Sequence, residues 1–253
     1  SNTNNFLFLN SALEFSNNIS VSNNAIELGW TPRNTDDFYD LEWGWVSDED
    51  GNGGNIPLDD LTFKYKKNST RVRTLSSHYK IPLIYEKGYL FYRVRAVQTN
   101  GPGNEDAFSL WTRNSYLQDQ IDGSYQIIPD NYYYIEQGHE DSLNWQHSVA
   151  YAELGKRKDI IAYADGTLRN RQKMIASINQ QSSQDNIIVD ETIYDFNGRP
   201  AITTMATPTT SSYPNGFNYQ HNLNRNLEGA AFSWQDFDKD IELIEGVSLK
   251  ELW

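Results

Sequence analysis

The acidic stretch at residues 48–59 (DEDGNGGNIPLD) holds the residue types and spacing that come closest to a chemical motif in this chain. Asp48, Asp50 and Asn52 alternate ahead of a glycine, and Asp59 occupies the twelfth position, as in a twelve-residue calcium-binding loop. Calcium takes six to eight oxygen ligands, and alternating acidic and amide side chains can turn several oxygens toward one point. The spacing therefore predicts a weak calcium site formed by these four side chains.

The same stretch also departs from a calcium loop in ways that favour a simpler interpretation. Its last position is an Asp and not a bidentate Glu, and Asn55 stands where an apolar residue is usual. The stretch follows a predicted strand, whereas a calcium loop of this type lies between two helices. The alternative is a glycine-rich acidic turn between two strands that needs no ion.

Other sequence patterns that could support catalysis are weak or absent. The chain has no cysteine, which excludes disulfides, thiolate zinc sites and a cysteine nucleophile. Its four histidines follow no metal-binding spacing, and it contains no Gly-x-Ser-x-Gly, phosphate-binding loop or dinucleotide-binding motif. We therefore expect no enzymatic activity and no cofactor other than weakly bound calcium.

Composition narrows the classes of partner. The chain has 253 residues, with 21 basic and 34 acidic side chains and a formal net charge of -13. Such a charge disfavours binding to nucleic-acid phosphates and anionic lipid headgroups. No apolar run approaches the roughly 20 residues that span a bilayer, so we expect neither nucleic-acid binding nor membrane insertion.

The elements that position these residues are predicted to be β-strands. In the first half, apolar and aromatic residues alternate with polar or small ones in three runs, which is typical of half-buried strands. The apolar members of these runs are Ile26, Leu28 and Trp30, then Tyr39, Leu41, Trp43 and Trp45, and then Leu90, Tyr92, Val94 and Ala96.

These runs resemble the strands of a fibronectin type III domain over residues 20–115. The segments AIELGWTP, YDLEWGWV and GYLFYRVRAVQTNGPG are similar to its second, third and sixth strands, and FSLWT is similar to its last. The resemblance implies a seven-stranded β-sandwich. We expect its core to contain Trp30, Leu41, Trp43, Tyr92 and Val94.

The second half shows shorter alternating runs separated by hairpin signals. Asp165-Gly166 and Asn197-Gly198 fall between such runs, and Asp-Gly and Asn-Gly tolerate the positive φ of tight hairpin turns. The pattern predicts a meander of β-hairpins. The whole chain is therefore expected to be all-β: a fibronectin III-like sandwich followed by a hairpin meander.

The hairpin segments resemble the YD repeats of RHS-type proteins. YDFNGRPAITTMATP (194–208) is similar to one such unit, and IAYADGTLRNRQKMI (161–175) is similar to the unit that precedes it. Taken in order, the segments resemble the N-terminal, pre-repeat part of a YD-repeat cell-surface protein of Bacteroidota. The corresponding division is an N-terminal segment (1–19), the sandwich (20–115), a linker (116–142) and the start of the hairpin repeats (143–253).

The resemblance implies a non-catalytic structural or interaction segment of a large protein that is secreted or displayed at the cell surface. It implies three kinds of partner: the remainder of a longer chain, surface partner proteins, and an export machinery such as the type 9 secretion system. A second hypothesis is a carbohydrate-binding module, because Trp43, Trp45, Trp111 and Trp145 could stack on sugars. A third, a hydrolase, has no specific motif in its support.

Overall fold

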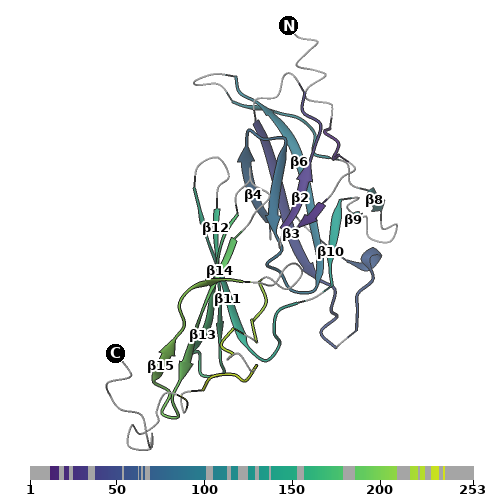
Figure 1. The fold of residues 1–253 in the computed structure, drawn as a ribbon. Helices are drawn as coiled ribbons and strands as arrows, with labels where there is room; N and C mark the ends of the chain where they lie inside the picture. The colour runs from purple at the N-terminus through teal and green to yellow at the C-terminus, as the bar shows by residue number, and fades with distance from the viewer. Residues whose placement is uncertain are drawn as a thin grey trace, which may run out of the picture.

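In the computed structural model, more than half of the described residues form antiparallel β-strands, arranged mainly in two bodies (Figure 1). The described residues are 12–16, 20–22, 25–33, 38–52, 54–61, 63, 65, 69–100, 105–112, 115–118, 125–128, 131–136, 138–152, 157–178, 186–209, 217–221, 223–225, 229–233 and 236. Among them the named elements are strands and one short 3-10 turn, η1 (Leu58–Asp60), and no α-helix occurs, so the predicted all-β class is confirmed. This described part contains no helix long and apolar enough to cross a membrane.

The first body is a sandwich of two antiparallel sheets. One sheet has the strand order β1 (Ser20–Ser22), β2 (Ala25–Gly29) and β5 (His78–Pro82). The other has the order β10 (Tyr132–Ile135), β6 (Gly88–Gln98), β3 (Phe38–Ser47) and β4 (Ser69–Thr74), with β7 (Ala107–Phe108) also paired to β6. Long strands β3 and β6 lie side by side over ten residues and form the centre of this sheet.

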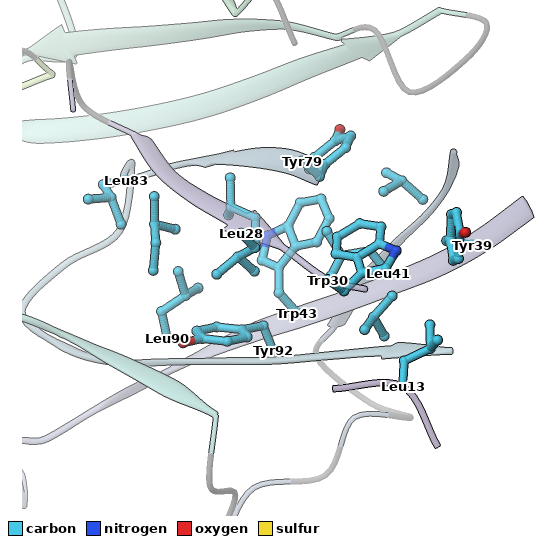
Figure 2. Close-up of a cluster of buried hydrophobic side chains, with 14 of the residues drawn as sticks. Leu13, Leu28, Trp30, Tyr39, Leu41, Trp43, Tyr79, Leu83, Leu90 and Tyr92 are labelled. Carbon is cyan, nitrogen blue, oxygen red and sulfur yellow. The ribbon is translucent and has the colours of Figure 1, made fainter. Parts of the chain in front are cut away.

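The core of the sandwich lies between the two sheets, as period-two alternation predicts. Trp30, Leu41, Trp43, Tyr92 and Val94 are all buried in one apolar cluster, which confirms the predicted core residues. Figure 2 shows these aromatic rings interleaved with leucines from both sheets. The rings of Trp30 and Tyr39 meet edge to face at 5.4 Å, and those of Trp43 and Tyr79 lie 5.8 Å apart.

The edge of this sheet beside β6 is formed by two separate segments of the chain. Residues 107–112 run along the far half of β6, where the Thr112 amide donates to the Val94 carbonyl at 2.9 Å. The chain then leaves the sheet for a separate hairpin, β8 (Ser115–Gln118) with β9 (Tyr125–Ile128), and returns as β10 along the near half of β6. Thus part of the segment that we predicted as a linker (116–142) belongs to the sandwich sheet.

The outer face of that sheet carries a second apolar cluster. Phe91 points away from the main core and is buried by Leu61, Phe63 and Tyr65 from the connection between β3 and β4. The Phe63 and Phe91 rings lie 5.1 Å apart, and Tyr89 packs against the same cluster. The long acidic connection therefore folds back as a cover over its own sheet.

The second body is a meander in which each strand pairs with the next along the chain. Its strands are β11 (Asn144–Tyr151), β12 (Arg157–Ala164), β13 (Asn170–Ile178), β14 (Asn186–Tyr194), β15 (Pro200–Thr203) and β16 (Thr207–Pro208). We call this six-stranded sheet the hairpin sheet. Its buried face presents Ile161, Tyr163, Met174, Ala176, Ile187 and Val189, at alternate positions along three successive strands.

The two hairpin turns at one end of this sheet share a plan built on Asp and Arg four residues apart. The Asp165 amide donates to the Arg169 carbonyl at 3.0 Å, and the Asp195 amide donates to the Arg199 carbonyl at 2.9 Å. In each turn one carboxylate oxygen accepts two backbone amides, and the other accepts the arginine Nε at 2.9 Å or 2.7 Å. The carboxylates thus hold both the loop backbone and the returning strand.

The fourth residue has the left-handed conformation in both turns, but its amino-acid type differs. In the second turn it is Gly198, with φ of 78°, as expected for an Asn-Gly signal. In the first turn it is Leu168, with φ of 61°, and not Gly166. The prediction that Asp165-Gly166 supplies the positive φ is therefore wrong, because this five-residue loop needs that conformation at its fourth residue.

Candidate functional site

The acidic loop was the strongest sequence candidate, and the structure gives its first carboxylate internal partners. Asp48 is 2% exposed. The Tyr134 hydroxyl donates to Asp48 Oδ2 at 2.7 Å, and Lys87 Nζ lies 3.3 Å from the same oxygen. Tyr134 comes from β10 and Lys87 from the connection before β6. Asp48 therefore joins the end of β3 to β10 and to the start of β6.

Asp50 caps its own loop. Its Oδ1 atom accepts the amides of Asn52 at 2.7 Å and Gly54 at 2.9 Å, while its own amide donates to the Gly54 carbonyl. The hydrogen bond from Asn52 is the largest cause that lowers the pKa of Asp50. This is the hydrogen-bonding pattern of a turn-forming aspartate.

The side chains of the other two predicted ligands are exposed or outside the described part of the structure. Asn52 is exposed, and Asp59 lies in η1 with its side chain outside the described residues. No set of three or more acidic, histidine or cysteine side chains suited to a metal ion occurs among the residues with described positions. The calcium site remains a prediction, and two of its four residues already have structural roles.

A denser group of polar and aromatic side chains lies where the sandwich meets the hairpin sheet. We call the connection between β5 and β6, residues 83–87, the junction loop. Ile84 is buried, and both Ile84 and Tyr85 pack in the apolar cluster of the hairpin sheet. Tyr85 also accepts a hydrogen bond from Trp43 Nε1 at 2.8 Å and stacks on Trp45. The loop therefore contacts both cores at once.

Glu86 is the polar centre of the junction. One carboxylate oxygen accepts Trp145 Nε1 at 2.7 Å, and the other accepts the His139 amide at 2.9 Å. Its backbone carbonyl accepts Trp45 Nε1 at 2.9 Å. One residue thus connects β3 of the sandwich, the chain before the hairpin sheet and strand β11.

His139 continues this network inward. Its Nε2 atom lies 2.8 Å from the Ile84 carbonyl, its Nδ1 atom contacts the Tyr163 hydroxyl, and its ring lies 4.0 Å from that of Trp145. The Tyr163 hydroxyl also donates to the Phe217 carbonyl at 2.8 Å. Burial lowers the pKa of His139 and raises that of Tyr163, because each charged form is disfavoured away from water.

A buried ion pair lies on the same face of the hairpin sheet. Arg157 Nε donates to Asp159 Oδ2 at 2.8 Å, and Arg157 Nη2 contacts Asp159 Oδ1. The same Oδ1 atom accepts a hydrogen bond from His147 Nε2 at 2.8 Å. The Arg157 guanidinium lies 5.7 Å from the Trp43 ring of the sandwich. Burial acts to raise the pKa of Asp159, but the bonds from His147 and Arg157 outweigh it and lower the pKa.

A second aromatic and ionic group covers the outer face of the sandwich. Guanidinium groups and rings alternate in the order Phe108, Arg95, Trp111, Arg93 and Tyr65, with separations of 4.0–4.6 Å. The same arginines pair with two buried carboxylates of β3, Asp40 at 2.8 Å and Glu42 at 2.5 Å. The Trp111 ring therefore packs against two guanidiniums of its own sheet.

These contacts join separate elements of the fold to one another. The carboxylates of Glu86, Asp159 and Asp48 each accept hydrogen bonds from side chains of neighbouring elements, and those bonds join strands or bodies to one another. Sequence patterns did not single out Glu86, because it lies in a connection with no periodicity. The alternation of Trp145 and His147 was a usable signal for β11, and both side chains do contact neighbouring elements.

Searches for relatives add no assignment to this geometry. The chain matches no protein-family model, no curated protein and no solved structure.

Proposed function

We propose that this chain is a non-catalytic structural and interaction segment of a larger exported YD-repeat protein, located in the secreted or cell-surface fraction. The observation that carries the proposal is the repetition of one turn structure in two alternate hairpins of the meander, β12–β13 and β14–β15. Both turns place Asp and Arg four residues apart, with the same backbone and side-chain hydrogen bonds. Repetition of this kind is typical of arrays in which neighbouring units stabilise one another.

Contacts between the two units support this proposal. The Arg169 guanidinium of the first turn lies 5.0 Å from the ring of Tyr194, the Tyr of the next unit. The Tyr194 hydroxyl donates back to the Asn170 carbonyl at 2.8 Å. The Arg of the first unit and the Tyr of the second therefore contact the neighbouring unit. These residues, which define the repeat, stabilise the contact between units.

The junction supports a scaffold in which the sandwich starts the repeat array. Glu86, His139 and Ile84 connect the sandwich to the first hairpins through hydrogen bonds and shared apolar packing. A spacer that carried an independent function would need no such connection. Export by a system such as type 9 secretion, and calcium in the acidic loop, are further parts of the proposal and rest on the sequence patterns alone.

Carbohydrate binding is the alternative, and the tryptophans named for it have internal partners. Trp43 is fully buried, and the indole nitrogens of Trp45 and Trp145 both donate to Glu86. Trp111 packs against Arg93 and Arg95. Rings used in this way are poorly placed for sugar stacking, which favours the scaffold.

Two experiments test the proposal. The open reading frame that encodes this chain should continue into further units with Asp and Arg four residues apart in predicted hairpins. In addition, the purified chain should neither bind a glycan array nor hydrolyse a panel of polysaccharides. An open reading frame without further units would contradict the repeat assignment, and saturable sugar binding or turnover would contradict the non-catalytic scaffold.

A further inference from the structure

Strand β11 forms one edge of the hairpin sheet, and its outer side has no described strand beside it. All eight of its residues pair with β12 in continuous register, from Asn144 with Ala164 to Tyr151 with Arg157, without a bulge. In an antiparallel pair every second residue turns its N–H and C=O away from the partner strand. The outer side of β11 therefore carries a regular row of backbone donors and acceptors.

This edge lacks the features by which proteins usually prevent strand pairing. Exposed edges are commonly short, charged, bulged or interrupted by proline. The β11 sequence NWQHSVAY contains no Lys, Arg, Asp, Glu, Pro or Gly. Several other described edges do have such features: β4 carries Arg71 and Arg73, β5 carries Lys80 and Pro82, and β1 and β10 have only three and four residues.

We propose that the β11 edge is a self-association site, at which β11 of a second copy of this chain pairs antiparallel and joins two hairpin sheets into one. The inference goes beyond the proposed function, because it rests on the geometry of this edge and not on the presence of further repeats. A following repeat would extend the opposite end of the sheet, beyond β15, and would leave β11 unpaired.

Two observations favour a second copy as the occupant. The first is charge: each chain carries a net charge of -13, and an uncharged strand is where two such chains can approach with little repulsion. The second is the burial pattern of β11, in which odd-numbered side chains from Trp145 to Val149 are half-buried and even-numbered ones are exposed. Antiparallel pairing of β11 with itself matches half-buried positions with half-buried positions and exposed with exposed.

A pair of charge variants tests the site while leaving the fold intact. Gln146 and Ser148 are exposed on the same face of β11, so Gln146→Lys with Ser148→Lys places like charges opposite each other in the paired strands. The matched control is Ala201→Lys with Thr203→Lys, at two exposed positions of the opposite edge strand β15. Sedimentation velocity over a concentration series measures the monomer–dimer equilibrium of the full chain.

We expect the wild-type chain and the β15 control to form dimers. The β11 lysine variant should dissociate at least ~10-fold more readily, because close like charges weaken strand pairing. Mixing it with a Gln146→Glu, Ser148→Glu variant should restore the dimer as a heterodimer. A wild-type chain that stays monomeric, a dimer insensitive to the β11 charges, or a dimer equally lost in the control would overturn the proposal.

Cysteine scanning determines whether the pairing is antiparallel. The chain contains no cysteine, so a single cysteine introduced at any position from 145 to 150 is the only thiol present. Antiparallel pairing brings one position next to its own copy at the symmetry axis. Disulfide yield should therefore peak at one position and fall on both sides. A flat yield, or no yield above that of Thr203→Cys on β15, would exclude this pairing.

Discussion

The sandwich and the hairpin sheet bury their apolar side chains in different ways. The sandwich fills its core from its own two sheets, with Leu28 on one and Trp43 on the other. The hairpin sheet is a single layer, and its apolar face is covered by Ile84 of the junction loop and by Phe217 from the chain beyond the strands. The sandwich therefore takes most of its core from its own two sheets, whereas the cover of the hairpin sheet comes from residues outside that sheet.

The largest effect should come from the sandwich core. Trp30→Ala is expected to lower the free energy of unfolding by about 3–5 kcal/mol, because it removes a large buried ring that packs against Tyr39. Urea denaturation measures this loss. Leu110→Ala, at a position 52% exposed, is the control and should change stability by no more than about 0.5 kcal/mol. Equal stability of the two variants would refute the core assignment.

The next effect should show that the hairpin sheet depends on the sandwich. Ile84→Ala is expected to cost about 2–4 kcal/mol, because it opens a cavity in the cover of the sheet. Ile188→Ala serves as the control, since Ile188 lies on the opposite face and is 39% exposed. Chemical denaturation should show a much smaller loss for it. If both variants lost the same amount, the junction loop would not be a significant part of the core.

A smaller effect should come from the polar part of the junction. Glu86→Gln replaces a carboxylate oxygen with a donor that faces either the Trp145 indole or the His139 amide, and should cost about 1–3 kcal/mol. A double-mutant cycle with Trp145→Phe should give a coupling energy of about 0.5–3 kcal/mol. Additive losses within error would mean that this hydrogen bond contributes no specific coupling.

The two turns provide a comparison within the hairpin sheet. Gly198→Ala should destabilise by about 1 kcal/mol, since φ is positive there. Leu168→Gly should stabilise by roughly 0.5 kcal/mol, because relief of left-handed strain exceeds the added chain entropy. Gly166→Ala, with no atom within 4 Å of the added carbon, is the near-neutral control. Thermal melts can rank the three variants, and a destabilising Leu168→Gly would contradict the assigned loop geometry.

The smallest expected effect is a loss of stability of the two hairpin turns at acidic pH. Hydrogen bonds from Thr167 lower the pKa of Asp165, and the backbone bond from Arg199 lowers that of Asp195. A lowered pKa in the folded state means that the turns are stabilised above the ordinary Asp value of about 3.9 and lose this stabilisation as pH falls through the folded value. Carboxyl carbon NMR titration should place both midpoints below that value. Midpoints at or above it would show that the carboxylates do not cap the turns.

Much of this fold could be predicted because period-two alternation is a local signal. Trp30, Leu41, Trp43, Tyr92 and Val94 occupy the core positions that the alternation predicts. Turn positions in the hairpin sheet followed from Asp, Asn and Gly. Within the turns, the left-handed residue was predicted correctly only where it is Gly198, because nothing in a leucine indicates positive φ.

The roles of Glu86 and Asp48 in joining separate elements could not be predicted, because they depend on contacts between segments that are distant in the sequence. Glu86 and Trp145 are 59 positions apart, and Asp48 and Tyr134 are 86 apart. Sequence spacing suggested a metal ligand for Asp48, whereas the return of β10 to the sheet gives it Tyr134 and Lys87 as partners. Neither pairing has a local pattern that reveals it.

Hydrogen exchange of Ile81→Ala and Ile84→Ala tests most directly whether the junction loop holds the hairpin sheet to the sandwich. These residues are three positions apart, but Ile81 lies in the sandwich core and Ile84 in the cover of the hairpin sheet. Ile81→Ala should speed exchange mainly in β2, β3 and β6, and Ile84→Ala mainly in β12, β13 and β14. Unchanged exchange in those three hairpin strands upon Ile84→Ala would contradict the account.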